Sequence, residues 1–334
     1  MNIKTTMKVA LAATTMAMAS ATMANDYKDE YRMSLVVGTA FPWGQGGQIW
    51  ADLVRERTDG RINIKLYPGV SLVNGDQTRE FAAVRQGVID MAIGSTINWS
   101  PQIKELNIFS MPFLATTYAQ TDALTGGEVG KKIFELIEQR GAIPLAWGEN
   151  GFRQLSNSKR IVTSPADLKG MKIRVVGSPL FVDAFTALGA NPTSMSWADA
   201  QPALASGAVD GQENPLSIFV AAKMDKLNQK YITDWNYMND PLVFVVNKEV
   251  WASWTPEDQK IVRQAALDAG EQQIALARKP VKETILEMGV GISTLTPEQL
   301  EVFKQTTRPV FDKWVDRVGP DLVEMAEQAV ANAQ

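Results

Sequence analysis

The spacing of apolar side chains changes between two periods along the chain. Residues 61–67 alternate apolar and polar side chains, the period of a half-buried strand, whereas residues 45–57 repeat at the longer period of an amphipathic helix. Short apolar runs typical of buried strands occur, with helical patterns between them, at 33–37, 90–94, 142–147, 172–176 and 242–246. This alternation predicts an α/β fold with a largely parallel sheet.

The chain from residue 255 onward is predicted to be mostly helical. The sequence Thr-Pro-Glu-Asp at 255–258 is typical of a helix start, and the pattern continues to about residue 283 with Pro280 as a kink. A second helix start at Thr296 is followed by helical periodicity to the last residues. Long C-terminal helices are therefore expected.

Residues 1–24 have the features of a secretory signal peptide. Lys4 and Lys8 form a basic start, residues 9–19 are mostly apolar, and small residues follow up to Ala24. The apolar run is too short to span a bilayer. We expect cleavage of this segment, after Ala21 or after Ala24, and export of the mature protein.

Composition removes several classes of function. The 334 residues suffice for two ordinary domains, and without an obvious linker the chain is expected to cross between two lobes more than once. The chain has no cysteine and no histidine, which excludes thiol nucleophiles, Ser-His-Asp triads and thiolate or imidazole metal sites. A net charge of −4 without a basic block argues against nucleic acid as a partner. Catalysis by carboxylates or lysine stays open, and no metal or cofactor motif is present.

The glycine-rich stretch 44–47 is interpreted as a turn at the start of a helix. It lacks both the lysine of a phosphate-binding loop and the spacing of a dinucleotide-binding one.

Residues 164–215 hold the most informative polar positions. Arg174 lies on the short apolar strand 172–176, directly before a helix start, an arrangement suited to holding an anion. The alternative is a solvated edge strand. Arg153 follows a strand end and is expected close to Arg174, and Asn214 lies in a loop where its amide either caps a turn or reaches a ligand.

Nine tryptophans are present, and their positions divide them into two groups. Four fall in helical patterns and are expected to serve packing, namely Trp50, Trp251, Trp254 and Trp314. The others fall in loops or at strand ends, where clefts of α/β proteins lie, namely Trp43, Trp99, Trp147, Trp197 and Trp235. For any single one, core packing is an equal alternative, but we predict that several line a common pocket.

Five motifs in this order resemble those of the DctP-type substrate-binding proteins of TRAP transporters, over essentially the whole mature length. They are GRINIKLYPG (60–69), NGFR (150–153), DLKGMKIRV (167–175), LGANPTSM (188–195) and DGQENP (210–215). The resemblance implies a two-lobed, flytrap-like periplasmic binding protein, not an enzyme. It would capture an organic acid and deliver it to membrane-embedded TRAP permease subunits, as a monomer and without a cofactor.

The resemblance also implies roles for particular residues. Arg174 would form a two-pronged salt bridge with the substrate carboxylate, Arg153 would add a second contact, Asn214 would hydrogen-bond the same carboxylate, and Trp197 would lie against the ligand. Further pocket candidates, taken from position, are Gln77, Ser95 and Asn236, and from location only Trp43, Trp99 and Trp235.

Relatives that bind keto acids through a cation tend to have tryptophan at the position of Asn214, so we expect direct carboxylate binding without a metal. The tryptophans favour a ligand with a flat or apolar face, such as a sugar ring or an aromatic acid. Dicarboxylates and hydroxy acids stay open as ligands.

The predicted lobe bounds are 25–150 with about 240–279 for the first lobe, and 151–239 with about 280–334 for the second. Two other functions stay open: a secreted carboxylate-based lyase or hydrolase, and a ligand-presenting protein for a sensor. The binding protein of an ATP-driven transporter is disfavoured by the ordered motifs.

Overall fold

The computed structural model describes residues 27–333, so the predicted signal peptide lies outside the described residues. Within them, ten strands join in the order β2-β1-β3-β9-β4-β7-β5-β6, with β8 on β4 and β10 on β8. The strands are β1 (Tyr31–Ser34), β2 (Ile64–Tyr67), β3 (Met91–Ser95), β4 (Ala142–Asn157), β5 (Lys172–Val175), β6 (Asn191–Ser194), β7 (Gly211–Pro215), β8 (Tyr231–Asp234), β9 (Asn239–Asn247) and β10 (Gly291–Thr294).

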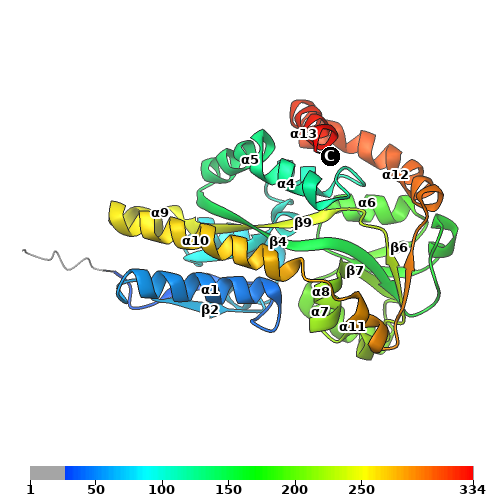
Figure 1. Ribbon diagram of the computed structural model, residues 1–334, viewed down its shortest axis with the longest axis horizontal. Helices are drawn as coiled ribbons and strands as arrows, with labels where there is room; N and C mark the ends of the chain where they lie inside the picture. Colours follow the sequence, from blue (N-terminus) through cyan, green and yellow to red (C-terminus); the bar gives the residue numbers. More distant parts are fainter. Residues whose placement is uncertain (1–26, 334) are drawn as a thin grey trace, which may run out of the picture.

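The longest strand, β4, joins two halves of the sheet. It pairs with β9 as far as Phe152, and from Arg153 to Asn157 it pairs with β7 and β8 instead. We call the half with β1, β2, β3 and β9 lobe I, and the half with β5 to β8 and β10 lobe II. Figure 1 shows β4 and β9 running together through the middle of the molecule. The chain passes between the lobes at β4, between β8 and β9, and again after α10 (Pro256–Ala277).

The prediction of a largely parallel sheet is wrong at the centre. β9 is antiparallel to both β3 and β4, and β4 is antiparallel to β7 and β8. Parallel pairs are confined to the flanks, where β1 pairs with β2 and β3, β5 with β6 and β7, and β8 with β10. An apolar run shows that a strand is buried, but not which way it runs beside a partner distant in sequence.

Helices cover both faces of the sheet. Besides α10 they are α1 (Pro42–Arg57), α2 (Glu80–Arg85), α3 (Thr96–Trp99), α4 (Tyr118–Gly126), α5 (Glu128–Gln139), α6 (Pro179–Ala187), α7 (Trp197–Ser206), α8 (Leu216–Ala221), α9 (Lys248–Ser253), α11 (Lys282–Glu287), α12 (Pro297–Val318) and α13 (Pro320–Asn332). Short 3-10 turns lie at Ser71–Val73, Gln77–Arg79, Lys104–Ser110, Pro165–Leu168 and Met224–Leu227.

The glycines at 44–47 lie inside α1, not in a turn before it. A Cβ at Gly46 would lie 2.4 Å from Cγ of Gln273, and one at Gly44 would lie 2.0 Å from the carbonyl oxygen of Gly38. Glycine therefore allows α1 to approach α10, and the two helices pack side by side (Figure 1). Gln273 in turn hydrogen-bonds the main chain of Glu149 on β4.

The helix predicted to continue through Pro280 ends at Ala277 instead. Pro280 has no N–H to donate and disfavours helical backbone at the residue before it, so α11 begins only at Lys282. In the break, Arg278 donates to Glu149 and Asp122 and lies 4.4 Å from the ring of Tyr118.

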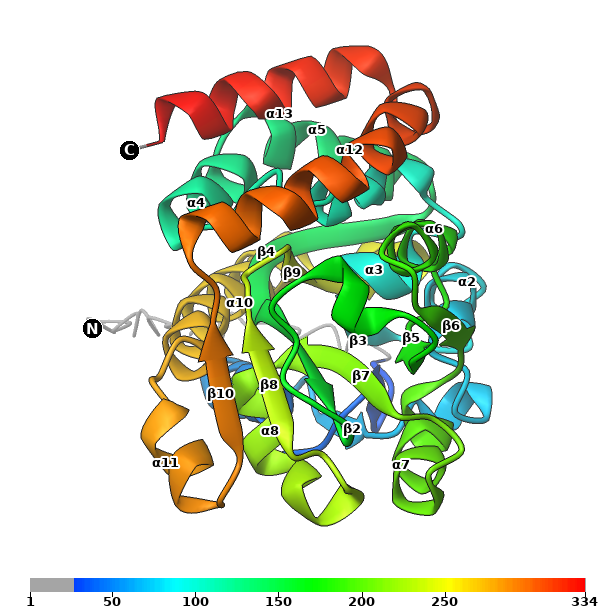
Figure 2. The ribbon, with the colours of Figure 1, turned by 90° about the vertical axis from the view of Figure 1, so that its right-hand side faces the viewer.

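The prediction of long C-terminal helices is confirmed. α12 packs against α6 of lobe II, and α13 packs against α4 and α5 of lobe I. Figure 2 shows the two helices lying across one end of the molecule, with β8 and β10 side by side below them. No helix among residues 27–333 is long and apolar enough to cross a membrane.

Candidate functional site

A cavity of about 30 Å³ lies between the two lobes. Six of the residues predicted from the sequence line it together, namely Trp43, Gln77, Arg153, Arg174, Trp197 and Asn214. Its volume is far below the roughly 300 to 1,000 Å³ of sites that hold drug-sized ligands. It is about the share of one water molecule in the liquid, so an organic ligand enclosed here would require the lobes to lie further apart.

Arg174 is buried but has no carboxylate partner among residues 27–333. Strand β5 lies between β7 and β6, so the side chain is only 1% exposed and the alternative of a solvated edge strand is wrong. Nε and Nη2 both donate to the carbonyl oxygen of Met195, at 3.1 and 2.9 Å. Burial lowers the pKa of Arg174 to about 10, with Glu213 opposing the shift, so the guanidinium is still charged at neutral pH.

The free edge of the guanidinium matches a carboxylate. Arginine has five N–H donors, and Met195 uses the edge formed by Nε and Nη2. The edge formed by Nη1 and Nη2 keeps two parallel donors, the geometry that binds both oxygens of a carboxylate. The ring of Trp197 lies beside the charge, with its centroid 5.9 Å from Cζ of Arg174.

Arg153, in contrast, already forms ion pairs with carboxylates of the protein. Its Nε and Nη2 donate to the two carboxylate oxygens of Glu213, and its Nη1 donates to Asp240 at 3.0 Å. Nη2 also donates to the main-chain oxygen of Glu213 at 2.8 Å. Burial acts to lower the pKa of Arg153, but the two carboxylates outweigh it and hold the pKa above its usual value. Few donors are left for a ligand.

A chain of hydrogen bonds inside lobe II holds Asn214. Gln229 donates to the carbonyl of Leu227 and accepts from Ser156, which accepts from Gln212. Gln212 then accepts from Nδ2 of Asn214, at 2.5 Å. Each donor fixes the orientation of the next amide, so Asn214, which lines the cavity, keeps its second Nδ2 hydrogen and its Oδ1 without a partner among the described residues.

Trp43 and Gln77 reach the cavity from lobe I. Trp43 lies in the first turn of α1, not in a loop, and its Nε1 donates to the carbonyl of Ile93 at 2.8 Å. Gln77 is 4% exposed and accepts from the main-chain N–H of Trp197 in lobe II at 2.9 Å. This bond joins the two lobes beside the cavity.

Ser95 and Asn236 do not line this cavity. Ser95 donates to Asp240 at 2.6 Å, which places it behind the cavity wall. Asn236 accepts from Gln154 and lines a different pocket, of about 730 Å³, near Arg278.

Two of the tryptophan candidates lie in the core. Trp235 packs against Tyr237 at a ring-centroid distance of 4.9 Å. Trp99 is fully buried beside Phe81, and its Nε1 donates to Glu80 at 3.1 Å.

Three polar residues of the cavity were missed by the sequence analysis: Asn98, Asn150 and Asp240. Asn150 donates to Asp240 at 2.9 Å and belongs to the NGFR motif, so its position was a usable signal. Asp240 is the second residue of β9, directly before a mostly apolar run, and buried charges within strands are uncommon. Asn98 carried no comparable signal, because α3 is a single short turn.

Glu80, the partner of Trp99, gives a testable pH effect. It is fully buried and accepts from Ser34, and burial raises its pKa from 4.5 to about 7 against the hydrogen bonds of Ser34 and Trp99. The folded state therefore holds this proton more tightly than the unfolded one, and stability falls as pH rises through this range. We expect Glu80→Gln to leave the free energy of unfolding unchanged near pH 4 and to raise it by up to about 3 kcal/mol near pH 8. Urea denaturation at several pH values measures this, and an equal gain at every pH would contradict it.

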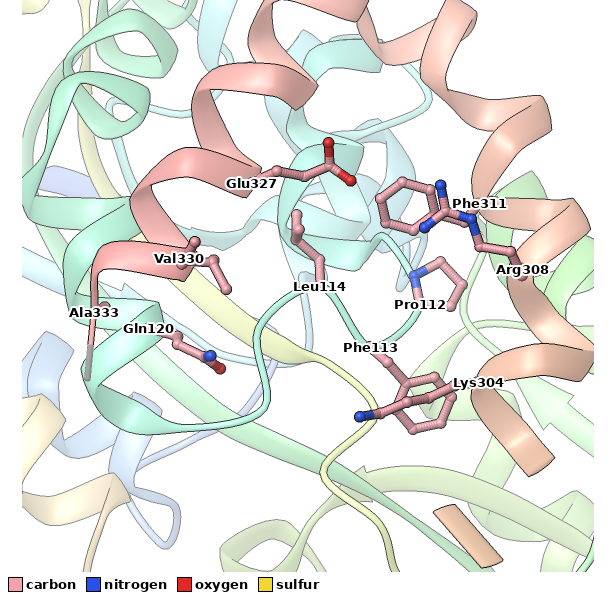
Figure 3. Close-up of a pocket in the computed structure, with 11 residues that line it drawn as sticks. Pro112, Phe113, Leu114, Gln120, Lys304, Arg308, Phe311, Glu327, Val330 and Ala333 are labelled. Carbon is pink, nitrogen blue, oxygen red and sulfur yellow. The ribbon is translucent and has the colours of Figure 1, made fainter. Parts of the chain in front are cut away.

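Figure 3 shows a separate pocket of about 500 Å³ between α12, α13 and the loop at Pro112–Leu114. Lys304 and Arg308 lie on one side of it and Glu327 on another. None of the residues predicted to bind a ligand lines this pocket.

Comparison with known proteins identifies the family. The family of bacterial extracellular solute-binding proteins, family 7 (DctP), matches residues 33–317. The 2,3-diketo-L-gulonate-binding periplasmic protein YiaO of Escherichia coli is 32% identical over 282 residues, 83% of this chain and 85% of its own length.

Two solved structures show the same two-lobed fold. A TRAP periplasmic solute-binding protein of Ralstonia eutropha H16, with bound (S)-2-acetolactate, is 64% identical with a TM-score of 0.90, covering 91% of this chain and 99% of that one. The sugar acid binding protein DctPAm of Advenella mimigardefordensis, in complex with galactonate, is 26% identical with a TM-score of 0.87. The match covers 91% of this chain and 98% of that one. The predicted resemblance and the predicted two-lobed fold are confirmed. This chain belongs to the DctP family of TRAP transporter solute-binding proteins, a family of binding proteins, not enzymes, that act in the periplasm.

Proposed function

We propose that this protein captures a small monocarboxylate bearing oxygen next to the carboxyl group, such as 2-acetolactate, and that Arg174 binds the carboxylate. One observation carries the proposal: Arg174 is a buried, charged guanidinium without a carboxylate partner among the described residues, with a free pair of donors at an interlobe cavity. Burying an unpaired charge is costly, and an anionic ligand offsets that cost.

The size of the ligand is inferred from the tryptophans and from the relatives. Of the five tryptophans expected near a cleft, Trp43 and Trp197 line the cavity, which weakens the argument for a large flat ligand. The 64% identical relative contains bound 2-acetolactate, whereas the relatives with galactonate and succinate are 26% and 25% identical.

Binding would work through lobe closure. In an open form Arg174 would be hydrated, and closure around the ligand would exclude that water and strengthen the ion pair. The ligand would shift the open–closed equilibrium by its greater affinity for the closed form. The lobes proposed to move are 25–150 with about 240–279, and 151–239 with about 280–334.

The remaining features of the transport function are proposed with it. Residues 1–24 would direct export of the protein and be cleaved off. The mature protein would act in the periplasm as a monomer without a cofactor and deliver its ligand to TRAP permease subunits in the membrane. A carboxylate-based enzyme is the main alternative. Incubation of 2-acetolactate with and without the protein, followed by mass spectrometry, separates the two, because a binding protein does not speed up loss of the acid beyond its spontaneous decarboxylation.

Titration calorimetry with 2-acetolactate, succinate and galactonate tests the ligand class. We expect 2-acetolactate to bind tightest, by at least about 10-fold over either other acid, a difference of about 1.4 kcal/mol. The larger acid would hold the lobes apart, and the second carboxylate of succinate would need a second free cation. Tighter binding of succinate or galactonate would overturn the assignment to a small monocarboxylate.

A further inference from the structure

We propose that Asn98 is a ligand-contacting hydrogen-bond donor, and that the opposite lobe sets its orientation through Gln77. The inference rests on the proposed function and deepens it, because it specifies a second chemical group that the ligand must carry. Three hydrogen-bonding groups in series establish the geometry. The main-chain N–H of Trp197 donates to Oε1 of Gln77 at 2.9 Å, and Nε2 of Gln77 donates to Oδ1 of Asn98 at 2.6 Å.

The direction of these bonds follows from the first donor. A main-chain N–H can only donate, so the atom of Gln77 that meets Trp197 is its oxygen. The other atom of that amide is then the NH₂ group, and the atom of Asn98 that meets it is also an oxygen. The Nδ2 group of Asn98 is thereby left as a donor that Gln77 does not use. This N–H of Trp197 is available because it belongs to the first turn of α7, where main-chain N–H groups have no partner within the helix.

Nδ2 of Asn98 has no partner among residues 27–333, although the side chain is only 3% exposed and lines the same small cavity as Arg174. A ligand that takes the place of water at this donor without supplying an acceptor would leave it unpaired, which is unfavourable. A ligand that carries only a carboxylate would satisfy Arg174 and leave Asn98 unpaired. A hydroxyl or carbonyl oxygen close to the carboxylate satisfies both. Asn98 therefore discriminates oxygenated acids from plain alkyl acids.

The orientation of the Asn98 amide depends on closure of the lobes. Gln77 and Asn98 belong to lobe I, whereas Trp197 belongs to lobe II. Without the N–H of Trp197, nothing in this chain of bonds fixes which atom of Gln77 faces Asn98. The Asn214 chain differs, because all of its members lie in lobe II. Asn98 thus becomes a fixed donor only when the lobes meet.

The test compares two probes by calorimetry. 2-Acetolactate carries a hydroxyl and a keto oxygen, and 2-methylbutanoate keeps the carboxylate and the branched skeleton without them. We expect Asn98→Leu to reduce the affinity ratio of the two acids by about 10- to 100-fold, mainly through weaker binding of 2-acetolactate.

A second variant reverses the orientation of Asn98 without altering that residue. In Gln77→Glu, one carboxylate oxygen still accepts from Trp197, but the other has no hydrogen to donate. Asn98 must turn its Nδ2 toward residue 77 and present Oδ1 to the ligand. We expect the ratio of the affinity for 2-acetolactate to that for 2-methylbutanoate to fall as in Asn98→Leu. The added charge weakens binding of both acids, so the ratio is the quantity to measure.

The outcomes separate this inference from the proposed function. If Asn98→Leu and Gln77→Glu leave the ratio unchanged while Arg174→Lys weakens both acids, the role of Asn98 is overturned and the carboxylate site stands. If Arg174→Lys leaves both affinities unchanged, or the wild type does not bind 2-acetolactate, the proposed function fails and this inference fails with it. Should Asn98→Leu not fold, Gln77→Glu decides alone.

Discussion

Replacing Arg174 with lysine is expected to weaken binding of 2-acetolactate by about 100-fold or more, an effect of about 3 kcal/mol. An ammonium group offers no planar pair of donors to a carboxylate, and it cannot keep both bonds to Met195 while reaching the ligand. The fold should remain intact, because lysine keeps the positive charge that acts on Glu213. Titration calorimetry with thermal unfolding of the unliganded protein measures both effects.

The matched control is Arg160→Lys, an equivalent change at an exposed arginine outside the cavity, which should leave affinity unchanged. Unchanged affinity in Arg174→Lys would show that the carboxylate is held elsewhere. A large loss of stability in that variant would instead indicate a structural role for the guanidinium.

Replacing Arg153 with methionine is expected to lower the free energy of unfolding by about 3 to 5 kcal/mol without any ligand present. The substitution leaves Glu213 and Asp240 buried, close together and without their cation. The loss should be smaller near pH 4 than near pH 7, because protonation removes the unpaired charges. Urea denaturation of the unliganded protein at both pH values measures this.

Two further variants test whether the unpaired buried charges cause this loss of stability. Arg153→Lys keeps the positive charge and should lose less stability than Arg153→Met. The triple variant Arg153→Met, Glu213→Gln, Asp240→Asn should regain part of the loss, because it removes the buried charges together. If Arg153→Met weakened ligand binding but cost under about 1 kcal/mol of stability, Arg153 would be a ligand contact and not a structural cation.

The two arginines thus have different predicted roles although the family motifs place both at the ligand. Arg153 is surrounded by Glu213 and Asp240, and its charge is balanced within the protein. Arg174 contacts the carbonyl of Met195 and the ring of Trp197, which carry no opposing charge, and Glu213 acts on it without forming an ion pair. Sequence position does not distinguish these states, because the balancing carboxylates come from β7 and β9, far from Arg153 along the chain.

The sequence by itself determined the features that depend on local pattern and ordered motifs. Strand and helix periods gave the α/β class and the long C-terminal helices, and five short motifs identified the family and several cavity residues, Arg174 among them. These signals are carried by residues close together in the chain, so no tertiary structure is needed to detect them.

Contacts between distant segments decided the rest. The antiparallel centre of the sheet follows from β9 lying between β3 and β4, which apolar runs do not encode. Trp99 and Trp235 resembled cavity candidates in sequence and lie in the core, since the same aromatic residue packs well in either place. Asn98 gains its role only because Gln77 bonds Trp197 of the other lobe. A polar residue becomes a site residue when its neighbours in space leave a hydrogen-bonding group unpaired, and those neighbours are chosen by tertiary packing.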